Sequence, residues 1–339
     1  MVALEGAVPV ATFRWRDGER LVVFGRGTLA EAAEELLESG YVLLVSPSGG
    51  SHSTGLIESA GSVHDVGPGR VDELAAALRP AIDGSRLVAL GGGRVIDVAK
   101  ALAAADPPRT VAAIPTTLSG AEMTAIHRHA AGLPADAPRV RPAIVIADPA
   151  LSASAPVELL ALSAGNALGH AVEGPVTPLS NPVARLAGLA AARLLDDGFA
   201  TRTPDDAARD SLALGSILAG YAIGSAGYGL HHVVSQTLAR FAGVGHGPAN
   251  TIMLPHTLQA LSRRAPDWSA QLTATLDRDP EELAVRLRDF GGVIRLRDAG
   301  ASEDELEVCA QRASERPELE MTPPRASIDE LRELYRAAY

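Results

Sequence analysis

The sequence is poor in cysteine, in lysine and in positive charge. Its single cysteine, Cys309, excludes a disulfide within the chain. Its 30 Lys and Arg residues are outnumbered by 41 Asp and Glu residues, which gives a formal net charge of −11. A protein that holds nucleic acid by its phosphates needs a basic surface, so we expect no nucleic-acid partner. Lys100 is the only lysine in the chain.

The chain also lacks a secretion signal and a convincing membrane span. It opens with MVALEGAVPVATFRW, in which no basic region precedes an apolar segment, so we expect a cytoplasmic protein. Residues 211–239 contain no Asp, Glu, Lys or Arg, and such a run is long enough to cross a bilayer. The run nevertheless contains five glycines, two histidines and a glutamine. We therefore expect a pair of buried helices of a soluble domain, and no membrane partner.

Two kinds of pattern divide the chain. In the first part short apolar runs alternate with helical patterns: the runs are RLVVFG, YVLLVS, SRLVALGGG and RTVAAIPTT, and the helical patterns are TLAEAAEELLES, RVDELAAALRPAI and RVIDVAKALAAA. This alternation predicts a parallel sheet with helices on both faces. After RPAIVIADPAL only Ala- and Leu-rich helical patterns follow. We therefore predict an α/β domain over residues 1–152 and an all-α domain over 153–339, with the active site in a cleft between them.

Three glycines at the end of one predicted strand indicate an anion site. In ALGGGRVIDVAK, Gly91, Gly92 and Gly93 separate a strand from a helix, so that backbone N–H groups and the helix N-terminus can close on an anion. A tight strand-to-helix turn is the alternative interpretation. Lys100 favours the anion site, because a compact ammonium is not equivalent to the guanidinium that this chain uses elsewhere. Asp97 lies three residues before Lys100, so the two side chains could instead simply pair on one helix face.

A second loop favours a dinucleotide as the ligand. In IPTTLSGAEMT a strand ends in Thr116 and Thr117, and Ser119 lies in the turn that follows. Hydroxyl and N–H groups at such a strand end suit a ribose or a pyrophosphate, although a capped helix start would look similar. The second strand ends in Ser46, and not in the carboxylate that would favour the 2′-hydroxyl of NAD. Because Ser46 does not repel a 2′-phosphate and Arg94 could bind one, we expect NADH or NADPH.

The helical part places several polar residues in uncharged surroundings. In SAGNALGHAVEG, Asn166 precedes His170 by four residues, which puts both side chains on one helix face. An Asp at this position would form half of a divalent-metal site with the histidine, whereas Asn166 is a neutral amide. The segment GLHHVVSQTLARFAGVGHGPAN adds His231, His232 and His246. We expect His170, His232 and His246 to converge below the nicotinamide, although any one of them alone would more often be a hydrogen-bonded core residue.

These motifs resemble those of the iron-containing alcohol dehydrogenase superfamily. The matching segments, in chain order, are GGGRVIDVAK, PTTLSGAEMT, IADPAL, GNALGHAVEG and GHGPANTIMLPH. The resemblance implies a Rossmann-like N-terminal domain and a helical C-terminal domain. A family histidine that relays a proton maps to Gln236. The metal ligands of the family, an Asp and three His, map to Asn166, His170, His232 and His246.

One branch of the superfamily, the maleylacetate reductases, is similar at the position of Asn166. These enzymes carry Asn there in a context close to GNALGH, and they share the doubled histidine of GLHH and the pair Asn181-Pro182. They work without a bound metal and add hydride to the double bond of an enone. Histidine N–H donors, here those of His232 and His246, can stabilise the enolate that forms. Three neutral imidazoles, by contrast, compensate the charge of a dication poorly.

The resemblance therefore implies an NAD(P)H-dependent oxidoreductase that reduces maleylacetate to 3-oxoadipate in aromatic catabolism, with no metal cofactor. In this interpretation His170 binds or protonates the substrate and Asn166 orients it. We also expect a small-molecule substrate and a homodimer. The predicted catalytic residues are Asn166, His170, His231, His232, His246 and Gln236.

Two alternatives stay open at this point. A metal-dependent alcohol dehydrogenase or aldehyde reductase would hold iron or zinc with His170, His232 and His246, and would use Asn166 as a weak carbonyl ligand. A catalytically inactive dinucleotide-binding paralogue is favoured by Gln236, because an amide does not titrate near neutral pH. The retention of all three histidines and of Lys100 speaks against the inactive paralogue.

Overall fold

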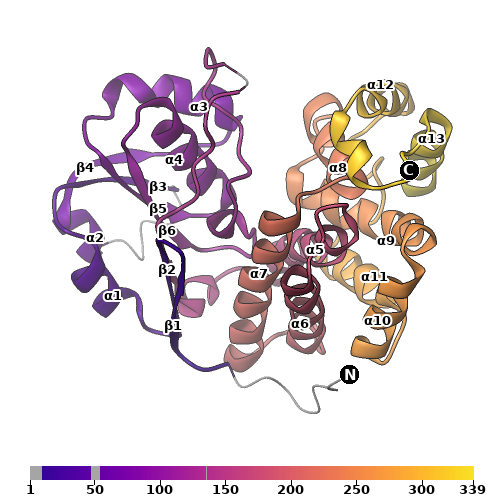
Figure 1. Cartoon of the computed structure of the whole chain (residues 1–339), viewed down its shortest axis with the longest axis horizontal. Helices are drawn as coiled ribbons and strands as arrows, with labels where there is room; N and C mark the ends of the chain where they lie inside the picture. Colours follow the sequence, from indigo (N-terminus) through magenta and orange to yellow (C-terminus); the bar gives the residue numbers. More distant parts are fainter. Residues whose placement is uncertain (1–9, 47–53, 135) are drawn as a thin grey trace. The chain divides into compact units, whose positions relative to one another are not determined.

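The computed structural model describes residues 10–46, 54–134 and 136–339, which fall into two compact units. The sheet unit consists of the described residues up to Ser154, and the helical unit is Ala155–Tyr339. Among the described residues, all strands belong to the sheet unit (Figure 1).

The sheet unit is built on a seven-stranded sheet with the strand order β1-β2-β7-β6-β5-β3-β4. β1 and β2 pair antiparallel at one edge, and the other neighbours in the sheet are parallel. The predicted α/β fold with a parallel sheet is confirmed, with an antiparallel hairpin added at its edge. The strands are β1 (Phe13–Asp17), β2 (Arg20–Phe24), β3 (Tyr41–Val45), β4 (Ala60–Asp65), β5 (Arg86–Gly91), β6 (Thr110–Pro115) and β7 (Ile144–Ala147).

The two edge strands, β1 and β4, were not predicted from the sequence. Both alternate between half-buried and exposed residues, so neither contains the continuous apolar run that marks the inner strands. β3, by contrast, is buried over its whole length. A strand covered on both faces has apolar residues at successive positions, and this is why the inner strands could be recognised.

Helices cover both faces of the sheet. Successive residues of a strand point to opposite faces, and on β3 this separates Val42 and Leu44 from Leu43 and Val45. The first pair packs with α3 and α4, and the second packs with α1 and α2. The helices of this unit are α1 (Leu29–Leu36), α2 (Thr54–Ser59), α3 (Val71–Leu78) and α4 (Gly93–Ala105), with 3₁₀ turns η2 (Arg79–Ala81), η3 (Ala121–Met123) and η4 (Pro149–Ser152).

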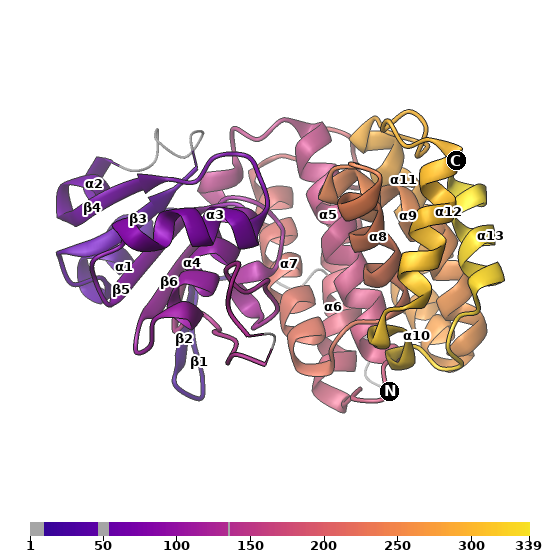
Figure 2. The ribbon, with the colours of Figure 1, turned by 90° about the horizontal axis from the view of Figure 1, so that it is seen from above.

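The helical unit is arranged around α5, in which 13 of 17 residues are buried. α5 packs against α6, α7, α9 and α11, and α12 lies beside both α8 and α13 (Figure 2). The all-α character predicted for this part of the chain is confirmed. Its elements are α5 (Val157–Glu173), η5 (Gly174–Val176), α6 (Pro182–Gly198), α7 (Asp206–Ala226), α8 (Leu230–Phe241), α9 (His246–Arg264), α10 (Pro266–Leu276), α11 (Pro280–Gly291), α12 (Glu303–Ser314), η6 (Pro317–Met321) and α13 (Ile328–Ala338).

The uncharged run 211–239 forms most of α7 and most of α8. Between the two helices the chain turns at Gly227, whose φ of +76° lies in the region that favours glycine. Among the helices described, none is long and apolar enough to cross a membrane.

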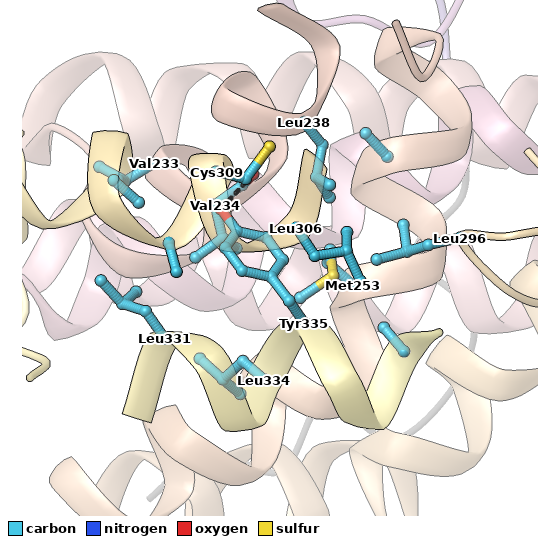
Figure 3. Close-up of a cluster of buried hydrophobic side chains, with 14 of the residues drawn as sticks. Val233, Val234, Leu238, Met253, Leu296, Leu306, Cys309, Leu331, Leu334 and Tyr335 are labelled. Atoms are coloured by element: carbon cyan, nitrogen blue, oxygen red, sulfur yellow. Dashed lines mark hydrogen bonds between the residues drawn. The ribbon is translucent and has the colours of Figure 1, made fainter. Parts of the chain in front are cut away.

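A core of apolar side chains from four helices holds α8 in place (Figure 3). The hydroxyl of Tyr335 donates to the carbonyl oxygen of Val234 at 3.1 Å, and burial raises the pKa of Tyr335 well above its usual value. Burial also raises the pKa of the Cys309 thiol to about 12. Cys309 is therefore an inert packing residue, and α12 and α13 together fix the helix that carries His231 and His232.

Candidate active site

The sheet unit gathers the predicted phosphate-binding residues where β5 and β6 end. Gly91 is the last residue of β5, and Gly92 is the N-cap of α4, where no side chain caps the first turn. The Thr116 N–H donates to the Gly91 carbonyl oxygen at 3.0 Å, which ties the loop after β6 to the glycine loop. The uncapped N–H groups at the start of α4 suit an anion, since the positive end of the helix dipole lies there.

The glycine loop and the loop after β6 lie so close together that side chains on the glycines would not fit. A Cβ on Gly92 would lie 3.0 Å from Cγ2 of Thr117, and a Cβ on Gly93 would lie 2.9 Å from Cβ of Ser119. Small residues in both loops therefore let the backbone and two hydroxyls line one surface. Such a surface can hold the pyrophosphate of a dinucleotide.

Ser46 and Arg94 lie next to the glycine loop. The Ser46 N–H donates to the carbonyl oxygen of Leu90 at 3.3 Å, which continues the β3–β5 pairing beyond the strand end. Arg94 is exposed in the first turn of α4. The structure brings these predicted dinucleotide-binding residues together around the ends of β3, β5 and β6: Ser46, Gly91, Gly92, Gly93, Arg94, Thr116, Thr117 and Ser119.

Lys100 supports the loop after β6 and has no hydrogen left for a phosphate. Its Nζ donates to the carbonyl oxygens of Ala121, Thr124 and Ile126 at 2.9, 3.2 and 2.9 Å. Nζ also lies 2.7 Å from Oδ1 of Asp97, and the lysine side chain is fully buried. Because an ammonium donates only three hydrogens, we correct the predicted phosphate contact of Lys100. Asp97 pairs with Lys100 on one face of α4, as the alternative considered above expects, and it compensates a buried charge.

In the helical unit, Glu173 joins the end of α5 to the start of α8. Its Oε1 accepts the His231 N–H at 2.6 Å, and its Oε2 accepts the His232 N–H at 3.3 Å and lies 2.6 Å from Nδ1 of His232. The carboxyl group is fully buried, and burial raises the pKa of Glu173 against the opposing effect of the α8 N–H groups. Glu173 therefore caps α8 and at the same time orients the His232 ring.

The hydrogen bond to Glu173 selects one tautomer of His232. With Nδ1–H donated to the carboxylate, Nε2 carries a lone pair. This Nε2 is buried and has no hydrogen-bond partner among the described residues. Burial lowers the pKa of His232 to about 3, so the ring is neutral near pH 7. His232 can bind a metal or accept a hydrogen bond through Nε2. The prediction that it donates an N–H to the substrate oxygen is therefore corrected, because Nε2 carries no hydrogen.

His170 and Asn166 lie beside His232. The rings of His170 and His232 are stacked, with centroids 4.8 Å apart and planes at 18°. Asn166 is one helical turn before His170 on α5, and both side chains are buried. Two residues of α5 and one of α8 thus form a compact polar cluster inside the helical unit.

His231 is a core residue and not a catalytic one, which corrects the prediction. It has no exposed surface, and its Nδ1 lies 2.8 Å from Oγ1 of Thr257. Its ring stands edge-on to His232, with centroids 4.9 Å apart and planes at 88°. A Cβ on Gly169 would lie 2.5 Å from Nε2 of His231. His231 therefore fills the space between α5 and α8 and supports the adjacent His232.

His246 is the first residue of α9 and is exposed. The Asn250 amide nitrogen lies 3.3 Å from Nε2 of His246 and 2.8 Å from its carbonyl oxygen. An amide N–H can only donate, so Nε2 of His246 accepts and Nδ1 carries the proton. After burial, the electrostatic effect of His246 is the second cause that lowers the pKa of His232. The two imidazoles are therefore close enough for a charge on one to be felt by the other.

Gln236 belongs to a polar network that the sequence did not predict. Its Oε1 accepts a hydrogen bond from Nη2 of Arg316 at 3.2 Å. The same guanidinium binds Glu318 and the hydroxyl of Tyr228. The ring of Tyr228 lies 5.8 Å from that of His232, so this network borders the histidine cluster.

A parallel sheet with a glycine loop, followed by a helical unit that buries a Glu–His pair among further histidines, defines an oxidoreductase of the two-domain dehydrogenase class. The chain belongs to the Fe-containing alcohol dehydrogenase family, because the model of the C-terminal part of that family matches residues 160–339.

Individual relatives agree with this placement. The chain is 31% identical to maleylacetate reductase 1 of Rhodococcus opacus over 321 residues, which cover 87% of this chain and 88% of that protein. It is 25% identical to the solved maleylacetate reductase of Agrobacterium tumefaciens, with a TM-score of 0.82 and coverage of 97% and 98%. The iron-containing alcohol dehydrogenase of Thermococcus thioreducens shares the fold, with 22% identity, a TM-score of 0.79 and coverage of 95% and 98%. The predicted family, its likeness to maleylacetate reductases and the oxidoreductase class are confirmed.

The prediction that the enzyme has no metal cofactor is wrong. The family to which the chain belongs is described as Fe-containing, and this implies an iron cofactor. The prediction relied on the neutral Asn166 and overlooked Glu173, which places a buried negative charge directly behind His232. A histidine whose other nitrogen is bound to a carboxylate is the arrangement that metal-binding histidines use. The buried lone pair of His232 therefore fits a metal ion.

The side chains around His232 do not form a complete metal site of one carboxylate and three histidines. Within the residues that the structure describes, no three His, Cys, Asp or Glu side chains are gathered as a metal-binding group. On α5, the amide of Asn166 stands where the family resemblance places a carboxylate. On the α9 side, His246 is exposed at the helix start.

Proposed function

We propose that the protein is a maleylacetate reductase-like enzyme that uses NADH or NADPH to reduce the enone double bond of maleylacetate to 3-oxoadipate. The likeness to maleylacetate reductase 1 of Rhodococcus opacus over 87% of the chain carries this proposal. In it, the sheet unit binds the dinucleotide and the helical unit binds the substrate.

The reaction adds a hydride and a proton across a carbon–carbon double bond. When bound, the dinucleotide would supply the hydride and iron would supply Lewis acidity at an oxygen of the substrate. The hydride goes to the carbon β to the ketone, the electron pair moves to the ketone oxygen as an enolate, and a proton from solvent or a side chain then goes to the α carbon. NAD(P)H is oxidised and the enone is reduced, so atoms and electrons balance.

The residues of the helical unit have separate tasks in this scheme. Glu173 holds the His232 ring and keeps Nε2 as a lone pair. Iron would be held by His232, with the adjacent His170 and the amide oxygen of Asn166; His246, the remaining ligand position of the family, would have to move to join them, because the described residues do not gather three such side chains.

The second candidate is an iron-dependent alcohol dehydrogenase or aldehyde reductase. It is favoured by the lone pair of His232, since a metal helps most where an alkoxide must be stabilised. Both candidates use the same dinucleotide and the same cluster, and they differ in the bond that is reduced.

The two candidates are separated by measuring NADH and NADPH oxidation with maleylacetate and with simple aldehydes, using iron-loaded protein. We expect kcat/KM for maleylacetate to exceed that for any unactivated aldehyde by about a hundredfold or more, which is about 2.7 kcal/mol. A preference for the aldehydes, or no oxidation with maleylacetate, would overturn the proposal in favour of the second candidate.

A further inference from the structure

Arg316 lies between α12 and η6, and Glu318 binds the edge of its guanidinium that carries Nε and Nη2. Its Nε and Nη2 donate to the two carboxylate oxygens of Glu318 at 2.9 and 2.8 Å. Burial is the largest single effect and acts to raise the pKa of Glu318, but the hydrogen bonds from Arg316, the backbone and Tyr228, together with the charge of Arg316, lower the pKa overall. Glu318 is therefore ionised near pH 7 and fixes the guanidinium plane.

Two further side chains connect Arg316 to the histidine cluster. Nη2 lies 3.3 Å from the hydroxyl of Tyr228, whose ring is 5.8 Å from that of His232. Nη2 also donates to Oε1 of Gln236 at 3.2 Å. Gln236 is four residues after His232 on α8, so the two side chains lie on one face of that helix. A single side chain, either Tyr228 or Gln236, thus separates Arg316 from His232.

Part of the guanidinium stays available for a ligand. Arginine has five N–H hydrogens, of which Nε and Nη2 carry three and Nη1 carries two. Within residues 10–46, 54–134 and 136–339, all the hydrogen bonds of Arg316 leave from Nε and Nη2, and its side chain is 28% exposed. Nη1 can therefore donate to an incoming carboxylate oxygen.

Gln236 suits this arrangement better than a protonated histidine would. The amide presents a carbonyl oxygen to the guanidinium, and this contact is neutral and favourable. An imidazole that becomes protonated during turnover would instead repel Arg316. The neutral amide of Gln236 therefore allows the permanently charged Arg316 to lie beside the histidine cluster.

We propose that Arg316 binds a carboxylate of a dicarboxylate substrate, with Tyr228, Gln236 and Glu318 fixing its orientation. This inference rests on the proposed function, because maleylacetate carries two carboxylates and an unactivated aldehyde carries none. Arg316 is a binding residue in this assignment, and the reacting centre belongs to the histidine cluster.

The test compares Arg316→Gln and Arg316→Lys with the wild type in the iron-loaded protein. We expect Arg316→Gln to raise KM for maleylacetate by about 30-fold or more, with kcat changed less than about threefold, because a lost charged partner costs about 2 kcal/mol or more. Calorimetric titration with adipate, a saturated dicarboxylate of the same length, should show the same loss of affinity. Arg316→Lys keeps the charge without the fork and should be intermediate.

Arg312→Gln is the matched control. Arg312 lies on α12 one turn before Arg316, is 53% exposed and pairs with Glu315, so its loss should change neither KM nor adipate binding. Thermal unfolding checks each variant, and Arg316→Lys keeps the test valid if Arg316→Gln does not fold.

The outcomes separate this inference from the proposed function. Unchanged KM and adipate affinity in a folded Arg316→Gln protein would overturn the carboxylate site, as would a fall in kcat at constant KM. A wild-type protein that is inactive on maleylacetate but binds adipate through Arg316 would overturn the proposed function alone. A wild-type protein that binds no adipate and reduces no maleylacetate would overturn both.

Discussion

Oε2 of Glu173 lies 2.6 Å from Nδ1 of His232, and this contact fixes both the tautomer of the histidine and the start of α8. The two residues lie 59 positions apart in the chain. The contact leaves Nε2 of His232 as a buried lone pair, so the ligand character of His232 depends on Glu173.

We therefore predict that Glu173→Gln weakens binding of Fe²⁺ or Zn²⁺ by about 10- to 100-fold, the usual cost of losing such an outer partner. The amide can still accept from the α8 N–H groups through one oxygen, so the fold should persist. Competition with a chromophoric chelator measures the affinity. Equal affinities in wild-type and variant proteins would show that the carboxylate does not act on the metal ligand.

Asn166→Asp should strengthen metal binding. The added carboxylate lies one turn before His170 and supplies negative charge to a dication otherwise held by neutral groups. We expect an increase of about tenfold or more, which is about 1.4 kcal/mol. Asn181→Asp is the control, because Asn181 is the N-cap of α6 and Asp caps a helix equally well. The prediction fails if both variants bind metal alike.

The stability of the fold should decrease in mild acid because of His127. This ring is 4% exposed, its Nε2 accepts the Val140 N–H at 3.1 Å, and burial lowers its pKa to about 4. The unfolded chain, in which the pKa is about 6.5, binds the proton first. The stabilisation is therefore complete above pH 6.5 and is lost as the pH falls towards 4.

A His127→Gln variant should lack this dependence. Between about pH 4.5 and 6, the free energy of unfolding of the wild type should rise with pH more steeply than that of the variant. The difference between the two slopes should be about 1.4 kcal/mol per pH unit. Urea unfolding at several pH values measures both slopes, with pH 8 as the reference at which only the pH-independent difference remains. Parallel slopes would exclude His127 as the titrating group.

Lys100→Arg should destabilise the sheet unit. The larger guanidinium must enter a fully buried space in which Nζ already binds three carbonyl oxygens and Asp97. Overpacking of this kind costs about 1–3 kcal/mol, and dinucleotide binding should weaken because the loop after β6 moves. Arg94→Lys, an exposed change in the same helix, should leave the urea midpoint unchanged. A stable Lys100→Arg protein would show that the loop tolerates displacement.

The sequence predicted those features of the fold and site that depend only on residues close together in the chain. The helical spacing of Asn166 and His170 and the continuous apolar run of β3 are of this kind. The unique lysine also marked an important position, but its partners Ala121, Thr124 and Ile126 come from a loop that only the folded sheet brings near. No local period could have identified that role.

The contacts that define the chemistry of the cluster are long-range. Glu173 and His232 are 59 positions apart, and Gln236 and Arg316 are 80 positions apart. A carboxylate three residues after His170 was the one available signal for Glu173, since residues at this spacing share a helix face. For Arg316, one of many arginines, the sequence offers no comparable signal.

Gly93 and Ser119 provide the most direct test of the predicted dinucleotide site. A Cβ on Gly93 would lie 2.9 Å from Cβ of Ser119, so Gly93→Ala should push the loop after β6 away from the start of α4. We expect this change to weaken NADH and NADPH binding by about tenfold or more, or about 1.4 kcal/mol, in a protein that still folds. The added Cβ would lie 2.9 Å from Cβ of Ser119 and 3.0 Å from its Oγ. Ser119→Ala should therefore relieve the clash only in part in the double variant, whereas Ser119→Gly removes both atoms and should restore most of the affinity. Fluorescence titration of the three single and two double variants measures this coupling. Additive losses in the Gly93→Ala/Ser119→Gly protein would mean that the two loops do not act together on the dinucleotide.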